Sequence, residues 1–453
     1  FPYTTLFRST ATHTNADAIG QFVTTIGGRN FPLEVLDAAR MALVDSIGVA
    51  IGAQGEGAEA AVRSVAARWG TTGQAQVILG GKATAAAAAL VNATMGHCLD
   101  YDDTHVGAIA HLSNPIWAAA LAVGANEGAS ERDILNAYIA GFEVGARVGG
   151  AKFGDALNMR GLHSTGVFGC LGATVAASAL LGLDDDGVAS ALGAAATQTS
   201  GLTASFGTMS KPFHAGKAAL NGVLSAELAR DGFVSATDLL EEDGGLAKAL
   251  VQDGSAAIQP LDFSQHWELT RNTYKPYAAC LLTHPVIDAA RALADQAEGR
   301  DIAEVHVDVN PACIKLAGKP SPTTGLEGKF STAFCTALAL TGHQATSLDF
   351  VAERINDPAL QNIVKRVRLS PDKSMDLRSA HMRINFINGD PLEAHTDMAR
   401  GNPDNPMDWD DMRQKFMAMV EPVLGVGAAN LFNLLRNFGE DGQLKKINAL
   451  LSR

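Results

Sequence analysis

Long apolar runs, paired cysteines and aromatic side chains are all scarce in this chain. No stretch reaches the roughly 18 apolar residues that a membrane-spanning helix needs, so we expect no membrane partner. The five cysteines form no CxxC pair, and an odd, scattered set is typical of a reducing compartment, which predicts a cytoplasmic location. The opening FPYTTLFRST lacks the pattern of a signal peptide, so we interpret it as a cloning or sequencing remnant and leave it out of the fold prediction.

Positive charge is also in short supply, since 35 lysines and arginines face 48 aspartates and glutamates and leave a net charge of −13. Nucleic acids are bound through basic surfaces, so this balance excludes a nucleic-acid partner, although it allows a small anionic substrate in a local cationic pocket. The motifs HExxH, GxSxG and GxxxxGK(S/T) are absent. Their absence argues against zinc proteases, serine hydrolases and phosphate-loop enzymes, and nucleotide cofactors have no recognisable binding motif.

Small and apolar residues are abundant, with 46 glycines and a hydrophobic fraction of 47%. Small side chains let helices approach closely, and helical patterning runs from about residue 14 to 254. Val35, Ala39, Leu43 and Ile47, for example, recur at every fourth position. The helices predicted in this part span residues 31–47, 58–69, 83–95, 114–124, 131–148, 165–181, 187–199, 215–231 and 236–242. A short strand is expected at residues 76–79.

The pattern changes near residue 261. Alternation of apolar and polar side chains predicts half-buried strands at residues 302–309, 364–369 and 381–387. Helical patterning returns after the turn-rich segment 401–406. We therefore predict a mainly α protein with a large all-helical domain built from both chain ends and a smaller inserted α/β lid domain. The predicted bounds are 14–262 and 400–453 for the helical domain and 263–399 for the lid.

Titratable residues gather directly after the alanine-rich pattern at 83–95. Three carboxylates and three histidines lie within fifteen residues there: His97, Asp100, Asp102, Asp103, His105 and His111. For any single one, a polar loop leading into the next helix is an equally good interpretation, but as a group between two apolar helices they favour a functional site. A metal site made by His105, His111 and Asp100 is the weaker alternative, because no metal-binding motif accompanies it.

Three further clusters lie where apolar helices begin or the domains meet. His163 and Ser164 precede a long apolar helix, whose free backbone N–H groups favour an anion, although Ser164 can equally serve as the helix N-cap. Lys211 and His214 stand among methionine, proline and phenylalanine, where a solvated lysine is the ordinary alternative. The segment 273–277 is as compatible with a linker turn as with a site. Together the clusters favour acid–base chemistry on an anion.

These clusters resemble the MmgE/PrpD family. The resemblance rests on residues 97–104, 163–166, 211–216, 275–284, 322–331 and 401–416, and it covers nearly the whole chain from about residue 14. It implies a helical domain with an inserted lid, a substrate cleft between the two, a homodimer, and catalysis without metal or organic cofactor.

The resemblance also implies roles for particular residues. Decarboxylase members use residues similar to Asp100, Thr104, His111, His163, Lys211 and Lys275. The catalytic residues predicted on this basis are His111, Asp100, His163, Lys211 and Lys275. The predicted substrate-binding residues are Thr104, His105, His214, Tyr277 and Ser164. Where decarboxylases place a tyrosine in the lid, residues 310–316 carry Cys313 and Lys315.

The predicted reaction is proton chemistry beside a carboxylate of a small di- or tricarboxylic acid. Removing such a proton builds negative charge on the carboxylate oxygens, which lysine and histidine side chains stabilise. We favour a lyase that removes water. An epimerase of a dicarboxylate such as iminodisuccinate comes second, and a cis-aconitate-type decarboxylase third. A non-catalytic helical scaffold is least favoured, because it gives no reason for these residues at the ends of apolar helices.

Overall fold

The computed structural model describes residues 14–70, 72–264 and 266–452, so the opening FPYTTLFRST, predicted to be a remnant, lies outside the described residues. The chain forms two compact units. The helical unit contains the described residues up to Cys98, Asp102–Asn272 and those from Trp409 on. The sheet unit contains Leu99–Tyr101 and Thr273–Asp408. The chain therefore contributes to the sheet unit twice, first with a very short segment next to His97.

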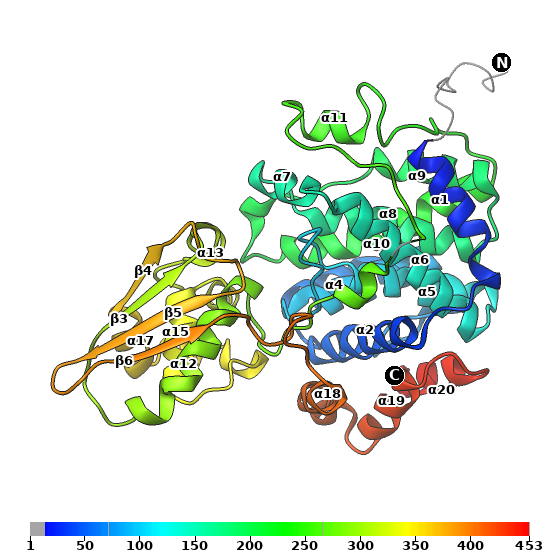
Figure 1. Cartoon of the computed structure of the whole chain (residues 1–453). Coiled ribbons are helices and arrows are strands. Elements are labelled where there is room, and N and C mark those ends of the chain that lie inside the picture. Colours follow the sequence, from blue (N-terminus) through cyan, green and yellow to red (C-terminus); the bar gives the residue numbers. More distant parts are fainter. Residues whose placement is uncertain (1–13, 71, 265, 453) are drawn as a thin grey trace. The chain divides into compact units, whose positions relative to one another are not determined.

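Helices dominate the chain, and the mainly α class is confirmed (Figure 1). The helices of the helical unit are α1 (Asn15–Thr24), α2 (Leu33–Gly52), α3 (Gly57–Ala66), α4 (Ala85–Cys98), α5 (Ser113–Glu127), α6 (Glu131–Gly149), α7 (Phe153–Met159), α8 (Ser164–Leu180), α9 (Asp185–Ala196), α10 (Ser210–Arg230), α11 (Leu246–Leu250), α18 (Trp409–Leu424), α19 (Gly427–Arg436) and α20 (Gln443–Leu451). Two short antiparallel strands, β1 (Ala75–Gln76) and β2 (Lys82–Ala83), accompany them. Within the described ranges, no helix has both the length and the apolar character needed to cross a bilayer.

Small residues set the spacing of the helices in this unit. Helix α10 packs on α4 and α8, and a side chain on Gly216 of α10 would overlap the backbone oxygen of Leu90 on α4. At the other end of the chain, α18 and α19 pack on α2 (Figure 1), where Gly48 leaves room for the ring of Phe416. Residues from both chain ends therefore share one core, whose density allows no larger side chain at these points.

The sheet unit is built on four strands in the order β4-β3-β5-β6. The strands are β3 (Ile302–Val309), β4 (Val367–Pro371), β5 (Ala380–Phe386) and β6 (Leu392–Thr396), and its helices are α12 (His284–Ala297), α13 (Pro311–Ala317), α14 (Gly325–Gly328), α15 (Thr332–Leu340), α16 (Ala352–Ile355) and α17 (Pro358–Val364). β3 runs parallel to β4 and antiparallel to β5. Val305, Val307 and Val309 are fully buried, which explains the alternation seen in the sequence.

The structure differs from the sequence-based prediction in several places, among them the strand expected at residues 76–79, of which only β1 at Ala75–Gln76 forms. Residues 236–242 form turns instead of a helix, because the backbone oxygens of Leu239 and Leu240 accept from the start of α11 across an intervening glycine turn. The strand predicted at 364–369 begins only at Val367, since α17 occupies the preceding residues. β6 was not predicted, because it buries neither face completely and so lacks a clear apolar period.

Candidate active site

The loop between α4 and α5 carries most of the titratable side chains that the sequence singles out. Within it, His105 and Ala110 pair as a short antiparallel bridge with N···O distances of 2.9 and 3.3 Å. Ile109 completes the reversal in the left-handed region, at φ 50°. The backbone from which His111 projects, just before α5, is therefore held by its own hydrogen bonds.

Asp102 lies between the rings of His97 and His111. Its oxygens are 2.8 and 2.9 Å from His97 Nδ1, and Oδ1 is 3.4 Å from His111 Nδ1. Because a carboxylate only accepts, both Nδ1 atoms carry their proton towards Asp102, which leaves each Nε2 as a proton acceptor. His97 Nε2 has no hydrogen-bond partner among the residues that the structure describes. This arrangement orients two imidazoles with one carboxylate.

His111 is the more accessible of the two imidazoles. Its side chain is 11% exposed, whereas those of His97 and Asp102 are fully buried. Its backbone N–H donates to Thr165 Oγ1 at 3.0 Å, and its Nδ1 lies 3.4 Å from Thr104 Oγ1. Backbone and ring are thus both fixed, which suits a group that must meet a substrate in one orientation.

A second pair of histidines lies beside a buried lysine. His163 precedes α8 as its N-cap residue, and its Nδ1 is 3.0 Å from Nδ1 of His214 on α10. The ring of His163 also stacks on His97 with a centroid separation of 5.8 Å. Lys211, near the start of α10, is buried with its Nζ 5.2 Å from the centroid of Phe206. Three predicted site residues, His163, His214 and Lys211, thus form one cluster with Asp102, His97 and His111.

Burial and the charge of Lys211 keep these histidines uncharged near neutral pH. Burial lowers the pKa of His97 to about 4, against the opposing effect of Asp102 and with a further lowering by Lys211. Burial and then Lys211 also hold the pKa of His163 well below its usual range, and they lower that of His214. Burial alone would raise the pKa of Asp102, but His97 and His111 hold it well below its usual range. The cluster therefore combines an ionised carboxylate, neutral imidazoles and a lysine, the groups needed to move a proton on an anion.

Two predicted substrate-binding residues are engaged by the protein itself. His105 Nε2 donates to Glu268 at 3.0 Å, and its Nδ1 accepts from the backbone N–H of Ala108. Ser164 Oγ donates to the backbone oxygen of Gly154 and accepts from Asn158. Their contacts stabilise the loop and the start of α8, and their roles towards a substrate stay predictions.

The remaining predicted residues belong to the sheet unit. Lys275 Nζ lies 3.0 Å from Asp100 Oδ1 and donates to the backbone oxygen of Asp100 at 2.7 Å. Asp100 has φ 52°, a left-handed conformation that aspartate tolerates better than most residues. The hydroxyl of Tyr277 donates to Asp288, and burial together with that negative charge raises the pKa of Tyr277. The roles predicted for Asp100, Lys275 and Tyr277 in catalysis and binding stay predictions.

Replacing Lys275 with methionine is expected to lower the free energy of unfolding by about 3–5 kcal/mol, because it leaves Asp100 buried without its cation. Urea unfolding followed by circular dichroism measures the loss. The double variant Asp100→Asn with Lys275→Met should recover most of it, since no charge then remains at the site. Equal stability of the single variant and the original chain would contradict a stabilising role for this pair.

Three site residues escaped the residue-by-residue prediction: His97, Asp102 and Thr165. The first two were counted in the polar cluster but received no role, because the helix end between them removes any regular spacing. Thr165 resembles an ordinary first-turn threonine, and its bond to the backbone of His111 joins segments that are 54 residues apart. The local sequence therefore gives no signal for the roles of His97 and Asp102 or for that of Thr165.

The same cluster could supply ligands to a metal ion. One ligand atom each from His97, Asp102 and His111 lies within 4.8 Å of the others, and imidazole with carboxylate is a common zinc ligand set. In the structure the Nδ1 atoms instead face Asp102 at hydrogen-bonding distances. Activity measured in the presence of a chelator distinguishes a metal site from a metal-free acid–base site.

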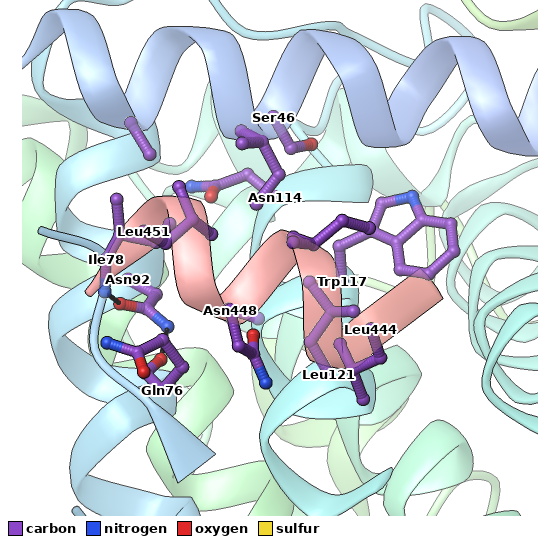
Figure 2. Close-up of a pocket in the computed structure, with 14 residues that line it drawn as sticks. Ser46, Gln76, Ile78, Asn92, Asn114, Trp117, Leu121, Leu444, Asn448 and Leu451 are labelled. Atoms are coloured by element: carbon purple, nitrogen blue, oxygen red, sulfur yellow. Dashed lines mark hydrogen bonds between the residues drawn. The ribbon is translucent and has the colours of Figure 1, made fainter. Parts of the chain in front are cut away.

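A separate pocket of about 30 Å³ lies under α20 (Figure 2). Ser46 comes from α2, Asn114 and Trp117 from α5, and Leu444 and Asn448 from α20. None of the 14 lining residues carries a titratable side chain, and the volume suits one or two water molecules. This pocket has no groups for acid–base chemistry, whereas the histidine cluster has them, so that cluster is the candidate active site.

Two family models match this chain. The model of the MmgE/PrpD N-terminal domain matches residues 17–259, and that of the MmgE/PrpD C-terminal domain matches residues 277–437. The chain belongs to the MmgE/PrpD family. The resemblance inferred from the sequence motifs is therefore confirmed.

Several relatives share one name. The cis-aconitate decarboxylase of Aspergillus terreus is 28% identical over 426 residues, which cover 87% of this chain and 86% of that protein. The cis-aconitate decarboxylase of Mus musculus is 27% identical over 354 residues, 74% of this chain and 72% of that protein. The Homo sapiens protein of the same name is 26% identical over 381 residues, 80% and 79% of the two chains.

Proposed function

We propose that this chain is a lyase that removes carbon dioxide from a small tricarboxylic acid of the cis-aconitate type, by acid–base chemistry without a metal. The observation that carries the proposal is the buried cluster in which Asp102 orients His97 and His111 beside Lys211 and His163. The names of the relatives favour decarboxylation over the dehydration that the sequence pattern favours. Dehydration and epimerisation need the same groups and are the alternative outcomes of the test.

In the proposed reaction, the bond between a substrate carbon and its carboxylate breaks and carbon dioxide leaves. The electron pair stays on the carbon and spreads towards the remaining carboxylates, where the positive charge of Lys211 stabilises it; such a contact is worth roughly 3–4 kcal/mol in a water-poor site. His111, held by Asp102 through Nδ1, accepts a proton from water at Nε2 and delivers it to that carbon, and the hydroxide left behind combines with the released carbon dioxide as bicarbonate. His163 binds a carboxylate through its ring N–H.

The test is proton NMR in D₂O with EDTA present. The purified chain is incubated with cis-aconitate, citrate, 2-methylcitrate, malate-type acids and iminodisuccinate in turn. We expect loss of cis-aconitate, release of carbon dioxide and one deuteron on the product carbon. A new vinyl signal from citrate or 2-methylcitrate without carbon dioxide would instead establish a dehydratase, and α-deuteration of iminodisuccinate an epimerase. Turnover that vanishes with EDTA and returns with zinc would contradict the metal-free proposal.

The homodimer and the cytoplasmic location that the sequence suggests stay predictions. Sedimentation velocity of the purified chain measures the first directly.

A further inference from the structure

A second group of buried charges surrounds Asp103, the neighbour of Asp102. The backbone N–H of Asp103 donates to Asp45 Oδ2 at 3.0 Å, and Lys415 Nζ lies 2.6 Å from Asp45 Oδ1. Asp45 belongs to α2 and Lys415 to α18, and all three side chains are buried. A residue close to the end of the chain is thereby connected to the loop that carries the candidate active site.

The carboxyl group of Asp103 has its own partners. Its Oδ2 accepts from Ser113 Oγ and from Asn272 Nδ2, and Tyr138 donates to Ser113 at 2.7 Å. Oδ1 has no hydrogen-bond partner within the described ranges. Burial, with the negative charge of Asp45 adding to it, raises the pKa of Asp103 to about 8. Asp103 is therefore largely uncharged at neutral pH, and Lys415 neutralises Asp45.

Stability alone is a poor explanation for this group. Buried ion pairs and buried carboxyls are usually no more stabilising than apolar side chains of the same size. Their geometry, in contrast, is demanding, because each bond has a narrow range of length and direction. Consecutive Cα atoms are about 3.8 Å apart, so a shift of Asp103 moves Asp102 with it. A shift of about 1 Å would break the 2.8 Å bond from His97 to Asp102.

We infer that Asp103, held by Asp45 and Lys415, is a positioning residue that sets the carboxylate of Asp102 between His97 and His111. Asp102 then orients the two imidazoles, and Asp103 fixes the loop to α2, α5 and α18. The catalytic consequence rests on the proposed function, whereas the effect on the two rings does not.

Nitrogen NMR of the histidine side chains tests the positions of the two imidazole rings directly. The chain is labelled with ¹⁵N-histidine, and the ring nitrogens of His97 and His111 are assigned with the variants His97→Asn and His111→Asn. In Asp103→Asn, which keeps the shape of the side chain, we expect the Nδ1 signals of both rings to shift, while the half-buried His381 and the exposed His395 of the sheet unit keep their positions. This result is independent of any turnover, so it stands or falls separately from the proposed reaction.

The matched control is Asp37→Asn. Asp37 also joins α2 to α18, through a bond from Trp409 Nε1 at 3.0 Å, but it is exposed and does not touch the loop. Its histidine spectrum should match that of the original chain.

If Asp103→Asn does not fold, Ser113→Ala replaces it, since this change removes one donor to Asp103 and should shift the same two signals by less. Unchanged signals in a folded Asp103 or Ser113 variant, with only the melting temperature lowered, would show that the group is purely structural and would overturn the inference.

Kinetics extend the test when the reaction is established. Misplaced catalytic groups lower kcat more than they raise KM, so we expect kcat of Asp103→Asn to fall by about tenfold or more at nearly constant KM. The double variant Asp45→Asn with Lys415→Met keeps an acceptor for the Asp103 N–H and leaves no unpaired charge. Its histidine signals should shift less than those of Lys415→Met alone, which leaves Asp45 buried without its cation.

Discussion

His111→Asn is expected to lower kcat by about 10²–10⁴-fold, which is the range that a positioned general acid–base contributes. Asparagine can still donate to Asp102 from the position of Nδ1, so the contacts around Asp102 persist. It has no counterpart of Nε2, so it cannot move a proton to or from a substrate. Steady-state kinetics on the acid identified by NMR, together with the melting temperature, measure the effect.

The control for this variant is His381→Asn on β5, a half-buried histidine paired with Asp308, which should leave kcat unchanged. If His111→Asn keeps kcat within threefold of the original while it folds normally, the proton is handled by another residue. His163 and His97 would then be the next to test, since both are neutral and buried beside it.

Lys211→Met should lower kcat by about 10²–10³-fold, the usual loss when one group that stabilises developing negative charge is removed from a buried site. Methionine fills similar volume, so packing against Phe206 is largely kept. The charge of Lys211 also lowers the pKa of His97, His163 and His214. Without this charge the pKa values of the three histidines rise, so their imidazoles become neutral only at a higher pH. Any residual activity that needs neutral imidazoles should therefore begin at a higher pH. A pH profile of kcat/KM for both chains measures the shift.

Lys217→Met is the matched control, because Lys217 lies on the same helix and is partly buried, but its partner is Asn221. It should change neither kcat nor the acid side of the pH profile. A Lys211 variant with an unchanged profile would mean that this lysine neither binds the substrate nor acts on the histidines.

The sequence determined the class of fold through periodicity. Helices such as α2 and α10 carry several buried residues at helical spacing, and the valines of β3 alternate, so their types were predictable from local pattern. The turns at 236–242 were not predictable in this way, since a short leucine- and acid-rich segment fits a helix as well as a turn. The outcome there depended on distant packing and on the glycines that follow.

The sequence also predicted the segments that form the candidate site, because charged and titratable residues next to alanine-rich helices are costly unless they are used or paired. It did not distinguish their partners. Within one short loop, Asp102 contacts two histidines, Asp103 contacts α2 and α5, and His105 contacts Glu268. Neighbouring residues of the same type thus have different partners in the fold.

By itself, then, the sequence determined the helical class, the family and the group of residues proposed as the site, since periodicity and motifs are local properties. The tertiary structure alone decided which carboxylate orients which imidazole, and that Lys415 on α18 is paired with Asp45 on α2. The physical reason is that hydrogen bonds and ion pairs depend on distances of about 3 Å between residues that the chain keeps far apart. Only the packing of the glycine- and alanine-rich helices brings those residues to such distances.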